Sequence, residues 1–275
     1  MASHRVLPGF RLSLSYAIAY LSVLVLIPLA ACLTKASSLT TSQFVAAVWS
    51  AQARSAYLVT FGSSAVAGVI DTVLGLLLAW VFVRYDFPFK RLLDSLIDLP
   101  FALPTAVAGL VYSSLYSQNG WLGQFLVPAG IKLAYSQAAI VFVLVFIGLP
   151  FVVRTVQPVL ESIDADIEEA AACLGANRWQ TFTRILLPSL YPALTTGFAL
   201  TFARAIGEYG SVVFVSANIP FETQIAPHLI VQKLEDFKYA EASAVAVVLL
   251  VASFAMLIVI NALERRSEAA NSSAN

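Results

Sequence analysis

The sequence predicts an all-α integral membrane protein with six transmembrane helices. Hydrophobic residues make up 59% of the 275 residues and charged residues only 12%, whereas about a quarter of the residues in a soluble domain are charged. The mean hydropathy of +0.83 also places the chain in a bilayer. A spanning helix needs about 20 mainly apolar residues. Six segments qualify: Leu12–Thr34, Tyr57–Val83, Leu99–Leu115, Ala134–Val153, Leu187–Val215 and Ala242–Leu263.

The third segment is the least regular of the six. Pro100 and Pro104 each lack a backbone N–H donor and disfavour helical geometry in the residue before them. Irregular backbone at membrane depth is tolerated where it is buried in protein or lines a cavity. We therefore interpret Pro100, Pro104 and Thr105 as candidates for the lining of a translocation path. The alternative is a proline kink that touches no solute.

The distribution of Lys and Arg over the short loops predicts the orientation of the chain, because these residues concentrate on the cytoplasmic side. Ten lie before the first segment, in alternate loops or after the sixth segment: Arg5, Arg11, Arg84, Lys90, Arg91, Arg154, Arg178, Arg184, Arg265 and Arg266. Five lie in the other loops: Lys35, Arg54, Lys132, Lys233 and Lys238. Both termini, and the loop between the fourth and fifth segments, are therefore expected in the cytoplasm.

The chain reads as one transmembrane domain over residues 1–266, with a longer loop at about 158–186. Residues 267–275 are small and polar, which predicts a disordered tail. The run from Leu29 to Cys32 resembles a lipoprotein cleavage site. However, the apolar run before Cys32 is about 20 residues long, whereas a signal peptide has roughly 7–15. We therefore expect an uncleaved first helix.

The loop between the fourth and fifth segments predicts two short helices that meet at a glycine. Four acids, which complement the positive end of a helix dipole, begin the first helix: Asp164, Asp166, Glu168 and Glu169. An apolar stripe at helical spacing follows: Ile167, Ala170, Ala171 and Leu174. Gly175 is placed to end this helix, because glycine adopts positive φ freely. Asn177, with Gln180 three residues later, has the pattern of a cap for the second helix.

The same loop carries a motif with defined spacing. Glu169-Ala170-Ala171 is followed after three residues by Gly175, and after nine more by Ile185-x-Leu187-Pro188. This pattern resembles the cytoplasmic loop by which permease subunits of bacterial ABC importers dock onto a separate ATPase. On periodicity alone, an ordinary amphipathic connector is the alternative. The resemblance implies that the ATPase-coupling residues are Glu169, Ala170, Ala171, Gly175, Ile185, Leu187 and Pro188.

Three ionisable residues lie within predicted spans, where a charge is costly and usually faces protein or water. Arg204 and Glu208 are four residues apart, so they can pair on one face of the fifth segment. The pair either presents Arg204 to an anion in the translocation path or is a structural ion pair that locks the helix. Asp71 has no obvious partner and is expected to face the interior of the bundle, capping or bonding to a neighbour.

Several classes of function are excluded by what the sequence lacks. It has no G-x-x-x-x-G-K-[ST] loop for ATP, and its two histidines and two cysteines are too few for a zinc site. No nucleophile elbow is present near His228. No basic cluster indicates nucleic acid, and the formal net charge is zero. The chain is therefore predicted not to be an enzyme and to hold no metal.

Four stretches extend the resemblance beyond the loop. They are similar to the T-type permease subunits of sulfate/thiosulfate ABC importers, which form part of the binding-protein-dependent transport permease family: Asp98–Gly109, Asn119–Gly123, Gly148–Leu160 and Ala203–Phe214. The likeness runs from about Leu7 to Asn261. It departs after Arg266 and at Cys173, where a small residue such as alanine is expected.

The resemblance implies a type I ABC importer permease fold with cytoplasmic coupling helices, as a multi-pass protein of the bacterial cytoplasmic (inner) membrane. It also implies several partners: a second related permease subunit, two copies of an ABC ATPase subunit, and a periplasmic sulfate- or thiosulfate-binding protein. ATP and magnesium would be bound by the ATPase, so no cofactor is expected in this chain.

Two other functions stay open. A molybdate or tungstate permease of the same superfamily would carry an oxyanion of the same shape and charge. A proton-driven secondary transporter would need a relay of acids within the membrane, and only Asp71 and Glu208 are available for one.

Overall fold

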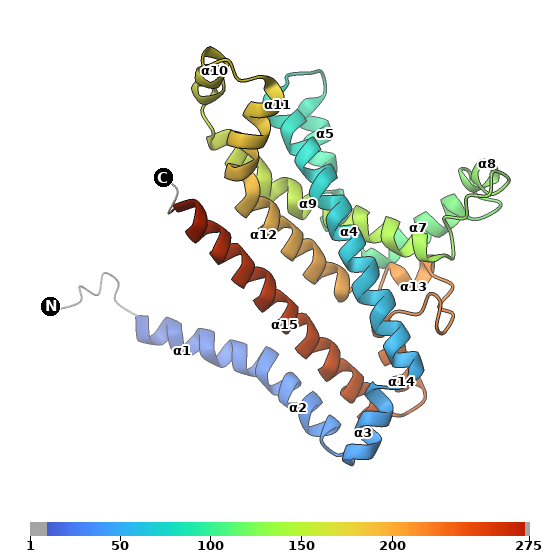
Figure 1. Cartoon of the computed structure of the whole chain (residues 1–275). Helices are drawn as coiled ribbons and strands as arrows, with labels where there is room; N and C mark the ends of the chain where they lie inside the picture. The colour runs from blue at the N-terminus through green and yellow to red at the C-terminus, as the bar shows by residue number, and fades with distance from the viewer. Residues whose placement is uncertain (1–9, 273–275) are drawn as a thin grey trace.

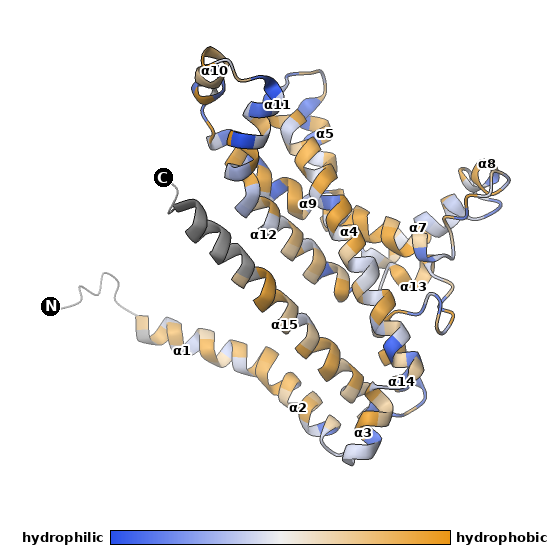
Figure 2. Cartoon of the chain, viewed as in Figure 1, coloured by the Kyte–Doolittle hydropathy of each residue, from blue (hydrophilic) through white to orange (hydrophobic). Residues whose placement is uncertain are grey.

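Every regular element in the computed structural model, which describes residues 10–272, is a helix (Figure 1). Five helical stretches of this part of the chain are long and apolar enough to cross a membrane: Leu12–Ala36, Ala51–Arg84, Gln137–Ser162, Arg178–Ile206 and Tyr239–Ile260. Figure 2 shows their hydrophobic character, with the polar residues concentrated at the ends of the rods and in the connections. The all-α membrane fold predicted from the sequence is confirmed.

The helices follow one another along the chain with short connections. In order they are α1 (Phe10–Leu21), a π-helical turn (Ser22–Leu26), α2 (Ile27–Ala36), α3 (Thr41–Val48), α4 (Ala51–Arg84), α5 (Lys90–Ile97), α6 (Leu99–Ala102), α7 (Thr105–Tyr116), α8 (Gly123–Leu126), α9 (Gln137–Ser162), α10 (Ala165–Cys173), α11 (Arg178–Thr181), a second π-helical turn (Phe182–Leu186), α12 (Leu187–Ile206), α13 (Val212–Val215), α14 (Ala226–Glu235) and α15 (Tyr239–Ser272).

Polar side chains cap the starts of two long helices, α4 and α9. The hydroxyl of Ser50 accepts a hydrogen bond from the backbone N–H of Ala53 at the start of α4, and that of Ser136 accepts one from Ala139 at the start of α9. Each bond satisfies a backbone donor that the first helical turn leaves without an intrahelical partner.

The third predicted span is divided among α5, α6 and α7 in place of one helix. The chain leaves helical geometry at Leu103, whose ψ is 134°, and at Pro104, whose ψ is 129°. The break lies where proline removes a donor and restricts the preceding residue. The predicted irregularity between Pro100 and Pro104 is therefore confirmed. The third segment consists of short helices, whereas each of the other five predicted spans contains a long apolar helical stretch.

Three boundaries differ from those predicted. The fifth span ends at Ile206, because the chain turns at Gly207 and resumes helical geometry only in α13, so the predicted end at Val215 was wrong. The loop predicted to begin near residue 158 begins after Ser162, because α9 accommodates Pro158 within it. The tail predicted to be disordered from residue 267 is helical through Ser272, and residues 273–275 lie outside the described part of the chain.

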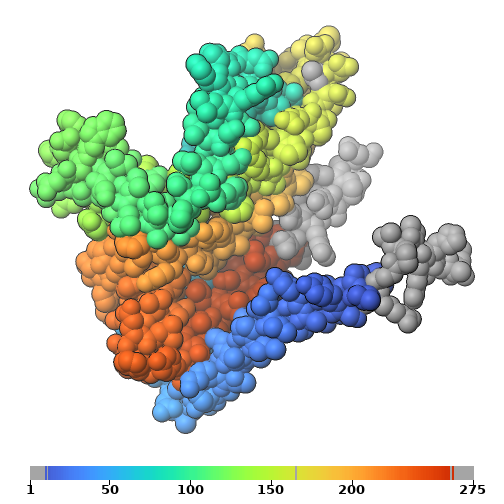
Figure 3. All heavy atoms as spheres, turned by 180° about the vertical axis from the view of Figure 1, so that it is seen from behind, coloured from blue at the N-terminus to red at the C-terminus, as the bar shows by residue number. Residues whose placement is uncertain are grey.

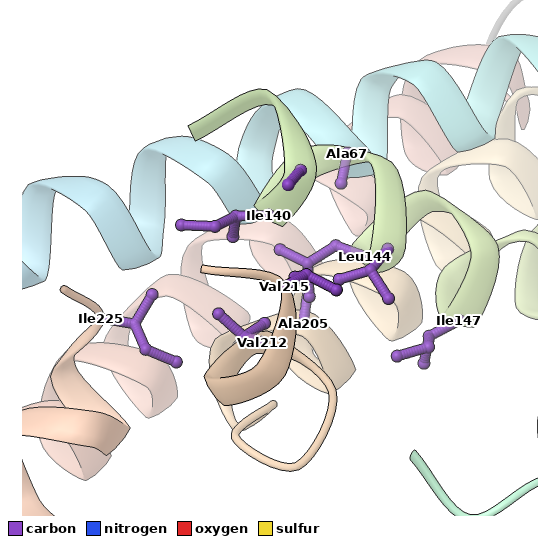
Figure 4. Close-up of a cluster of buried hydrophobic side chains, with 10 residues drawn as sticks. Ala67, Ile140, Leu144, Ile147, Ala205, Val212, Val215 and Ile225 are labelled. Carbon is purple, nitrogen blue, oxygen red and sulfur yellow. The ribbon is translucent and has the colours of Figure 1, made fainter. Parts of the chain in front are cut away.

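The core is formed by α4, α9 and α12, which pack against one another along their lengths. Figure 4 shows one cluster of buried side chains at this junction and at the neighbouring α13, with members from all four elements. A second cluster lies further along the same helices: Ala79, Val152, Val156, Leu160, Leu190, Ala193 and Leu194. Lipid is as apolar as these side chains, so close packing through small residues holds membrane helices together.

Glycines allow this close packing. The backbone of Gly75 in α4 lies against the side chain of Val152 in α9, and Gly197 in α12 approaches the same valine from another side. Gly148 in α9 lies against the carboxyl group of Asp71 and the methyl group of Thr201. A β-carbon at position 148 would overlap both groups.

The N-terminal helices are attached to the body mainly through α15. Cys32 Sγ lies 3.8 Å from the carbonyl oxygen of Ser243, and Ala36 packs with Val48 and Ala244. In contrast, α1 projects away from the body of the chain (Figures 1 and 3), and its apolar side chains, such as Leu12 and Tyr16, are exposed. In a membrane protein such a surface faces lipid or another subunit.

We predict that Gly148→Ala weakens the junction of α4, α9 and α12. The added methyl group would overlap Asp71 and Thr201, and overpacking of this kind costs about 1–3 kcal/mol. The amount of folded protein extracted in mild detergent, and its midpoint of thermal aggregation, should both fall. Gly62→Ala is the matched control, because a β-carbon at this helical glycine of α4 would meet no atom within 4 Å. An equal response of the two variants would contradict the packing argument.

Candidate functional site: a coupling loop and an ion pair at the end of α12

The predicted coupling loop forms two helices joined at Gly175. This residue has a φ of +84°. Its backbone N–H donates to the carbonyl oxygen of Ala172 at 3.0 Å, and the N–H of Ala176 donates to that of Ala171 at 3.0 Å. These two bonds form the Schellman motif that ends a helix through a residue with positive φ. The sequence-based expectation for Gly175 is confirmed.

The second helix begins with the predicted cap. The side-chain oxygen of Asn177 accepts a hydrogen bond from the N–H of Gln180 at 2.8 Å, and the Gln180 side chain accepts one from the N–H of Asn177 at 2.9 Å. Such a reciprocal pair satisfies two backbone donors at once. The loop therefore has a defined shape before any partner binds.

The apolar residues of this loop face outward. Leu174 is 89% exposed and Trp179 is 72% exposed, and Ile167 is also exposed. Of the predicted apolar stripe, only Ala171 is buried against the rest of the chain. Glu169, Ala170 and Gly175 are exposed. Exposed apolar side chains at the tip of a polar loop are typical of a docking surface for another protein.

The remaining motif residues connect this surface to the membrane helix. Ile185 lies in the second π-helical turn, and Leu187 and Pro188 begin α12. Leu187 packs against the second core cluster. Pro188 is the second residue of α12 and follows directly on the π-helical turn, where the helical hydrogen-bond register changes. The two halves of the motif thus differ: the first is an exposed surface and the second joins it to the core.

An arginine that the sequence analysis used only as a topological charge fixes this loop. Arg84, the last residue of α4, pairs with Glu168 through an Nη2–Oε1 distance of 2.6 Å. The same Nη2 donates to the carbonyl oxygen of Ile163 at 3.4 Å, and the guanidinium lies over the ring of Trp80. A cleft of about 560 Å³ opens between the end of α4 and the coupling helices. A separation of 84 positions from Arg84 to Glu168 leaves no local sequence signal for this pair.

The predicted pair at the far end of α12 is present. Arg204 Nη1 lies 2.5 Å from Glu208 Oε2. The other carboxylate oxygen of Glu208 accepts hydrogen bonds from the backbone N–H of Ser211 at 2.9 Å and from its hydroxyl at 3.0 Å. Glu208 is only 3% exposed, whereas the Arg204 side chain is 36% exposed. The glutamate is therefore fixed and buried, and it holds an arginine that reaches the surface of the chain.

The sequence predicted that Arg204 and Glu208 share one face of a single helix. That prediction was wrong. α12 ends at Ile206, and Glu208 follows the turn at Gly207. The carboxylate returns toward Arg204 from the irregular segment before α13. A pair of this kind ties the end of α12 to that segment, which a pair on one helical face would not do.

The beginning of α7 meets the same segment. The Thr105 hydroxyl lies against Gly210, and the backbone of Gly109 lies against that of Ser211, so that a β-carbon at either glycine would overlap its neighbour. The start of α7 thus packs on the segment that holds Glu208, although about a hundred residues separate the two in the sequence. Pro100 lies in α6, which packs on α9 through the rings of Phe101 and Phe151, and Pro104 is exposed just before α7.

A histidine adjoins the pair but carries little charge at neutral pH. His228, in α14, stacks on Tyr209 with 6.2 Å between ring centroids. Burial lowers the pKa of His228 below its usual 6.5, and the opposing effect of Glu235 is smaller. The imidazole is therefore mainly neutral at pH 7 and adds little positive charge beside Tyr209.

Asp71 faces the interior, as predicted, and lies apart from this cluster. It is fully buried in α4, against Gly148 and Thr201. Neither of its carboxyl oxygens has a hydrogen-bond partner among the described residues, so the expected bond to a neighbour is not formed there. Glu208 bonds to Arg204 and Ser211 and shares no partner with Asp71.

Comparison with known proteins agrees with this geometry. Residues 71–269 match the family described as "Binding-protein-dependent transport system inner membrane component". The chain belongs to this family. Its five long apolar helices are those of a multi-pass inner membrane component. The exposed loop from Glu169 to Gly175 and the pair at Arg204 both lie within the matched residues.

Named relatives cover nearly the whole chain. The sulfate transport system permease protein CysT of Escherichia coli (strain K12) is 46% identical over 266 residues, which are 97% of this chain and 96% of that protein. The protein of the same name from Synechocystis sp. (strain ATCC 27184 / PCC 6803 / Kazusa) is 48% identical over 248 residues, 90% of this chain and 87% of that protein. The resemblance to sulfate permeases inferred from the four stretches is confirmed.

Solved structures share the fold at low sequence identity. A chain of a bacterial alginate ABC transporter, crystallised with an alginate pentasaccharide-bound periplasmic protein, is 20% identical with a TM-score of 0.77, and 94% of each chain is covered. A chain of the MetNI methionine ABC transporter in an inward-facing conformation is 19% identical with a TM-score of 0.58, covering 83% of this chain and 99% of that chain. The predicted ABC importer permease fold is confirmed.

We predict that Gly175→Val abolishes association with an ATPase subunit. Valine at positive φ costs about 1–2 kcal/mol, which would move the exposed first half of the motif out of register. Gly130→Val is the matched control, because Gly130 has a similar φ of +81° in the loop after α8 and equally open surroundings. Co-purification of the ATPase with each variant is the measurement. Retention of the ATPase by Gly175→Val would show that the loop is only a connector.

Proposed function

We propose that this chain is the membrane permease subunit of an ATP-driven importer of sulfate or thiosulfate. The observation that carries this proposal is the pre-shaped, exposed loop around Glu169 and Gly175 in a chain 46% identical to a sulfate permease over 97% of its length. A loop that presents exposed apolar side chains such as Leu174 and Trp179 is typical of a docking surface for another protein. It supports a transporter whose energy comes from another subunit.

The proposed assembly contains two copies of an ABC ATPase subunit, a second related permease subunit and a periplasmic binding protein that delivers the anion. ATP and Mg²⁺ belong to the ATPase, and this chain performs no hydrolysis itself. Closure of the ATPase dimer would press on the loop at Ala170 and Gly175. Because Arg84 and Leu187 join this loop to α4 and α12, the pressure would reach the core helices.

The proposed point of contact with the anion is Arg204. A tetrahedral dianion needs fixed N–H donors and a positive charge, and a guanidinium supplies both through charge-assisted hydrogen bonds. Glu208, itself held by Ser211, fixes the orientation of Arg204 from its buried side. The exposed side of the guanidinium is then available to a passing anion. Thr105, at the same junction, offers a hydroxyl.

Two experiments separate this function from the alternatives. Uptake of labelled sulfate is measured in proteoliposomes that contain the complete complex with and without its ATPase. Sulfate uptake that needs ATP and persists with a protonophore supports the proposal, whereas uptake driven by a pH gradient alone supports a proton-driven carrier. Competition with unlabelled thiosulfate, molybdate and tungstate ranks the oxyanions, and preferential inhibition by molybdate would favour the molybdate alternative.

The proposed orientation predicts which cysteine is reached from each side. Cys173 is exposed at the end of α10, and Cys32 lies at the far end of the first span. A membrane-impermeant maleimide should label Cys173 in inverted vesicles and spare it in spheroplasts that retain an intact inner membrane. A Cys32→Ser background assigns the signal to Cys173. Labelling from the outside would place the coupling loop on the wrong side for an ATPase.

Variants of Arg204 and Glu208 test the anion contact. We expect Arg204→Gln to abolish sulfate uptake, although it leaves Glu208 as a buried charge without its partner, which is itself destabilising. The double variant Arg204→Gln/Glu208→Gln removes that charge, so it should recover assembly but not uptake. Assembled complex and uptake are measured for both single variants and the double variant. Recovered uptake in the double variant would show that the pair is purely structural.

A further inference from the structure

A second arginine, Arg154 in α9, has the most complete set of polar contacts in the described part of the chain. Its Nε and Nη2 donate to the two carboxylate oxygens of Asp98 at 2.9 and 2.7 Å. Nη1 donates to a carboxylate oxygen of Asp94 at 2.8 Å and to the side-chain oxygen of Gln157 at 2.7 Å. Nη2 also donates to the backbone oxygen of Asp94 at 2.8 Å. All five N–H donors of the guanidinium are used.

This network has the features of a rigid connection. The contact with Asp98 is bidentate, and such forks fix orientation as well as distance. Gln157 accepts from Arg154 and donates to Asp94 at 3.1 Å, which closes a ring of contacts. The Arg154 side chain is about one-third exposed. A single exposed ion pair contributes little, whereas several bonds on one planar group hold two segments in a defined register.

The network lies next to the candidate lining of the translocation path. Asp94 belongs to α5, and Asp98 directly precedes α6 and the proline break that ends at Pro104. Beyond that break, Thr105 contacts Gly210, beside the Arg204–Glu208 pair. The segment from Asp98 to Thr105 is therefore held at both ends, by Arg154 at Asp98 and by Gly210 at Thr105.

The other side of the network leads to the coupling loop. α9 ends at Ser162, and the carbonyl oxygen of the next residue, Ile163, accepts from Arg84. The same arginine pairs with Glu168 in the coupling helix α10. Figure 1 shows α5, α10 and α11 at the same end of the bundle. A displacement of α10 would therefore act on the end of α4 and on the residue after α9 and, through Arg154, on the broken third span.

We propose that Arg154 is a positioning residue that transmits movement of the coupling loop to the third span. The bidentate bond to Asp98 makes α6 follow α9, and α7 carries that movement to the segment that holds Glu208. This inference rests on the proposed function, since it concerns how ATP-driven movement of the loop changes the path of the anion. It identifies which charged group must stay bonded for hydrolysis to be converted into uptake.

The proposal predicts uncoupling when the geometry of the fork is lost. Arg154→Lys keeps the positive charge but cannot make a bidentate bond to Asp98 and also bond to Asp94. The complete complex, with its ATPase and binding protein, is reconstituted in proteoliposomes. We measure assembled complex, ATP hydrolysis and sulfate uptake. The lysine variant should assemble and hydrolyse ATP at a rate near that of the wild type, while at least tenfold less sulfate enters per ATP consumed.

Two further variants separate geometry from charge. The triple variant Arg154→Gln/Asp94→Asn/Asp98→Asn is neutral throughout, so it leaves no unpaired charge, yet it lacks the fork and should stay uncoupled. Lys90→Gln is the matched control, because it removes the nearby ion pair between Lys90 and the fully exposed Asp86. It should not change the amount of sulfate taken up per ATP. An unchanged ratio in Arg154→Lys, or a restored ratio in the triple variant, would overturn the proposal.

Loss of assembly is distinguished from loss of coupling. If Arg154→Lys does not assemble, Asp98→Asn provides the same test, since it removes the charge-assisted fork and keeps Arg154 bonded to Asp94. Failure of both variants to assemble would mean that the network is only structural and would overturn the proposal. Failure of the proposed function appears elsewhere, as wild-type complex that hydrolyses ATP but takes up no sulfate. The ratio is then measured with the oxyanion that the wild type does carry.

Discussion

Close contact among α4, α9 and α12 is the constraint on which the rest of this structure depends. Lipid gives apolar helices no reason to associate with one another, so their contact relies on packing at short range. The helices approach one another at Gly75, Gly148 and Gly197, which have no side chain to keep them apart. Val152 fills the space against Gly75 and Gly197. The result is a closely packed core of three helices. The segments with a candidate function, from the coupling loop to the Arg204–Glu208 pair, are attached to the ends or sides of these three helices.

Each of the three core helices has an arginine that bonds to an irregular segment beside it. In α4, Arg84 binds the beginning of the coupling loop. In α9, Arg154 binds α5 and the residue before α6. In α12, Arg204 binds the segment that leads to α13. Irregular backbone near a membrane needs partners within the protein. Arg84 and Arg154 each donate to a backbone carbonyl oxygen of such a segment, and Arg204 donates to the carboxylate of Glu208.

The sequence predicted what local chemistry determines. Hydropathy gives the long helices, glycine and Asn177 give the shape of the coupling loop, and the two prolines give the break in the third span. It missed what depends on distant residues. Arg154 and Asp98 are 56 positions apart and Arg84 and Glu168 are 84 apart, so no periodicity connects them. The end of α12 was also misplaced, because the apolar residues of α13 continue the hydrophobic run after Gly207 although the backbone turns there.

The number of donors already in use separates an arginine that holds the protein together from one that is available to a substrate. Arg154 has all five N–H groups bonded to protein oxygens and faces two carboxylates, so an anion would have to displace both acids and enter a region of net negative charge. Arg204 makes one hydrogen bond among the described residues, to a single carboxylate whose other oxygen is bound by Ser211. A dianion that approaches Arg204 meets free donors on a guanidinium held in place from behind. The difference between the two arginines follows from the number of acids that surround each one: two around Arg154 and one beside Arg204.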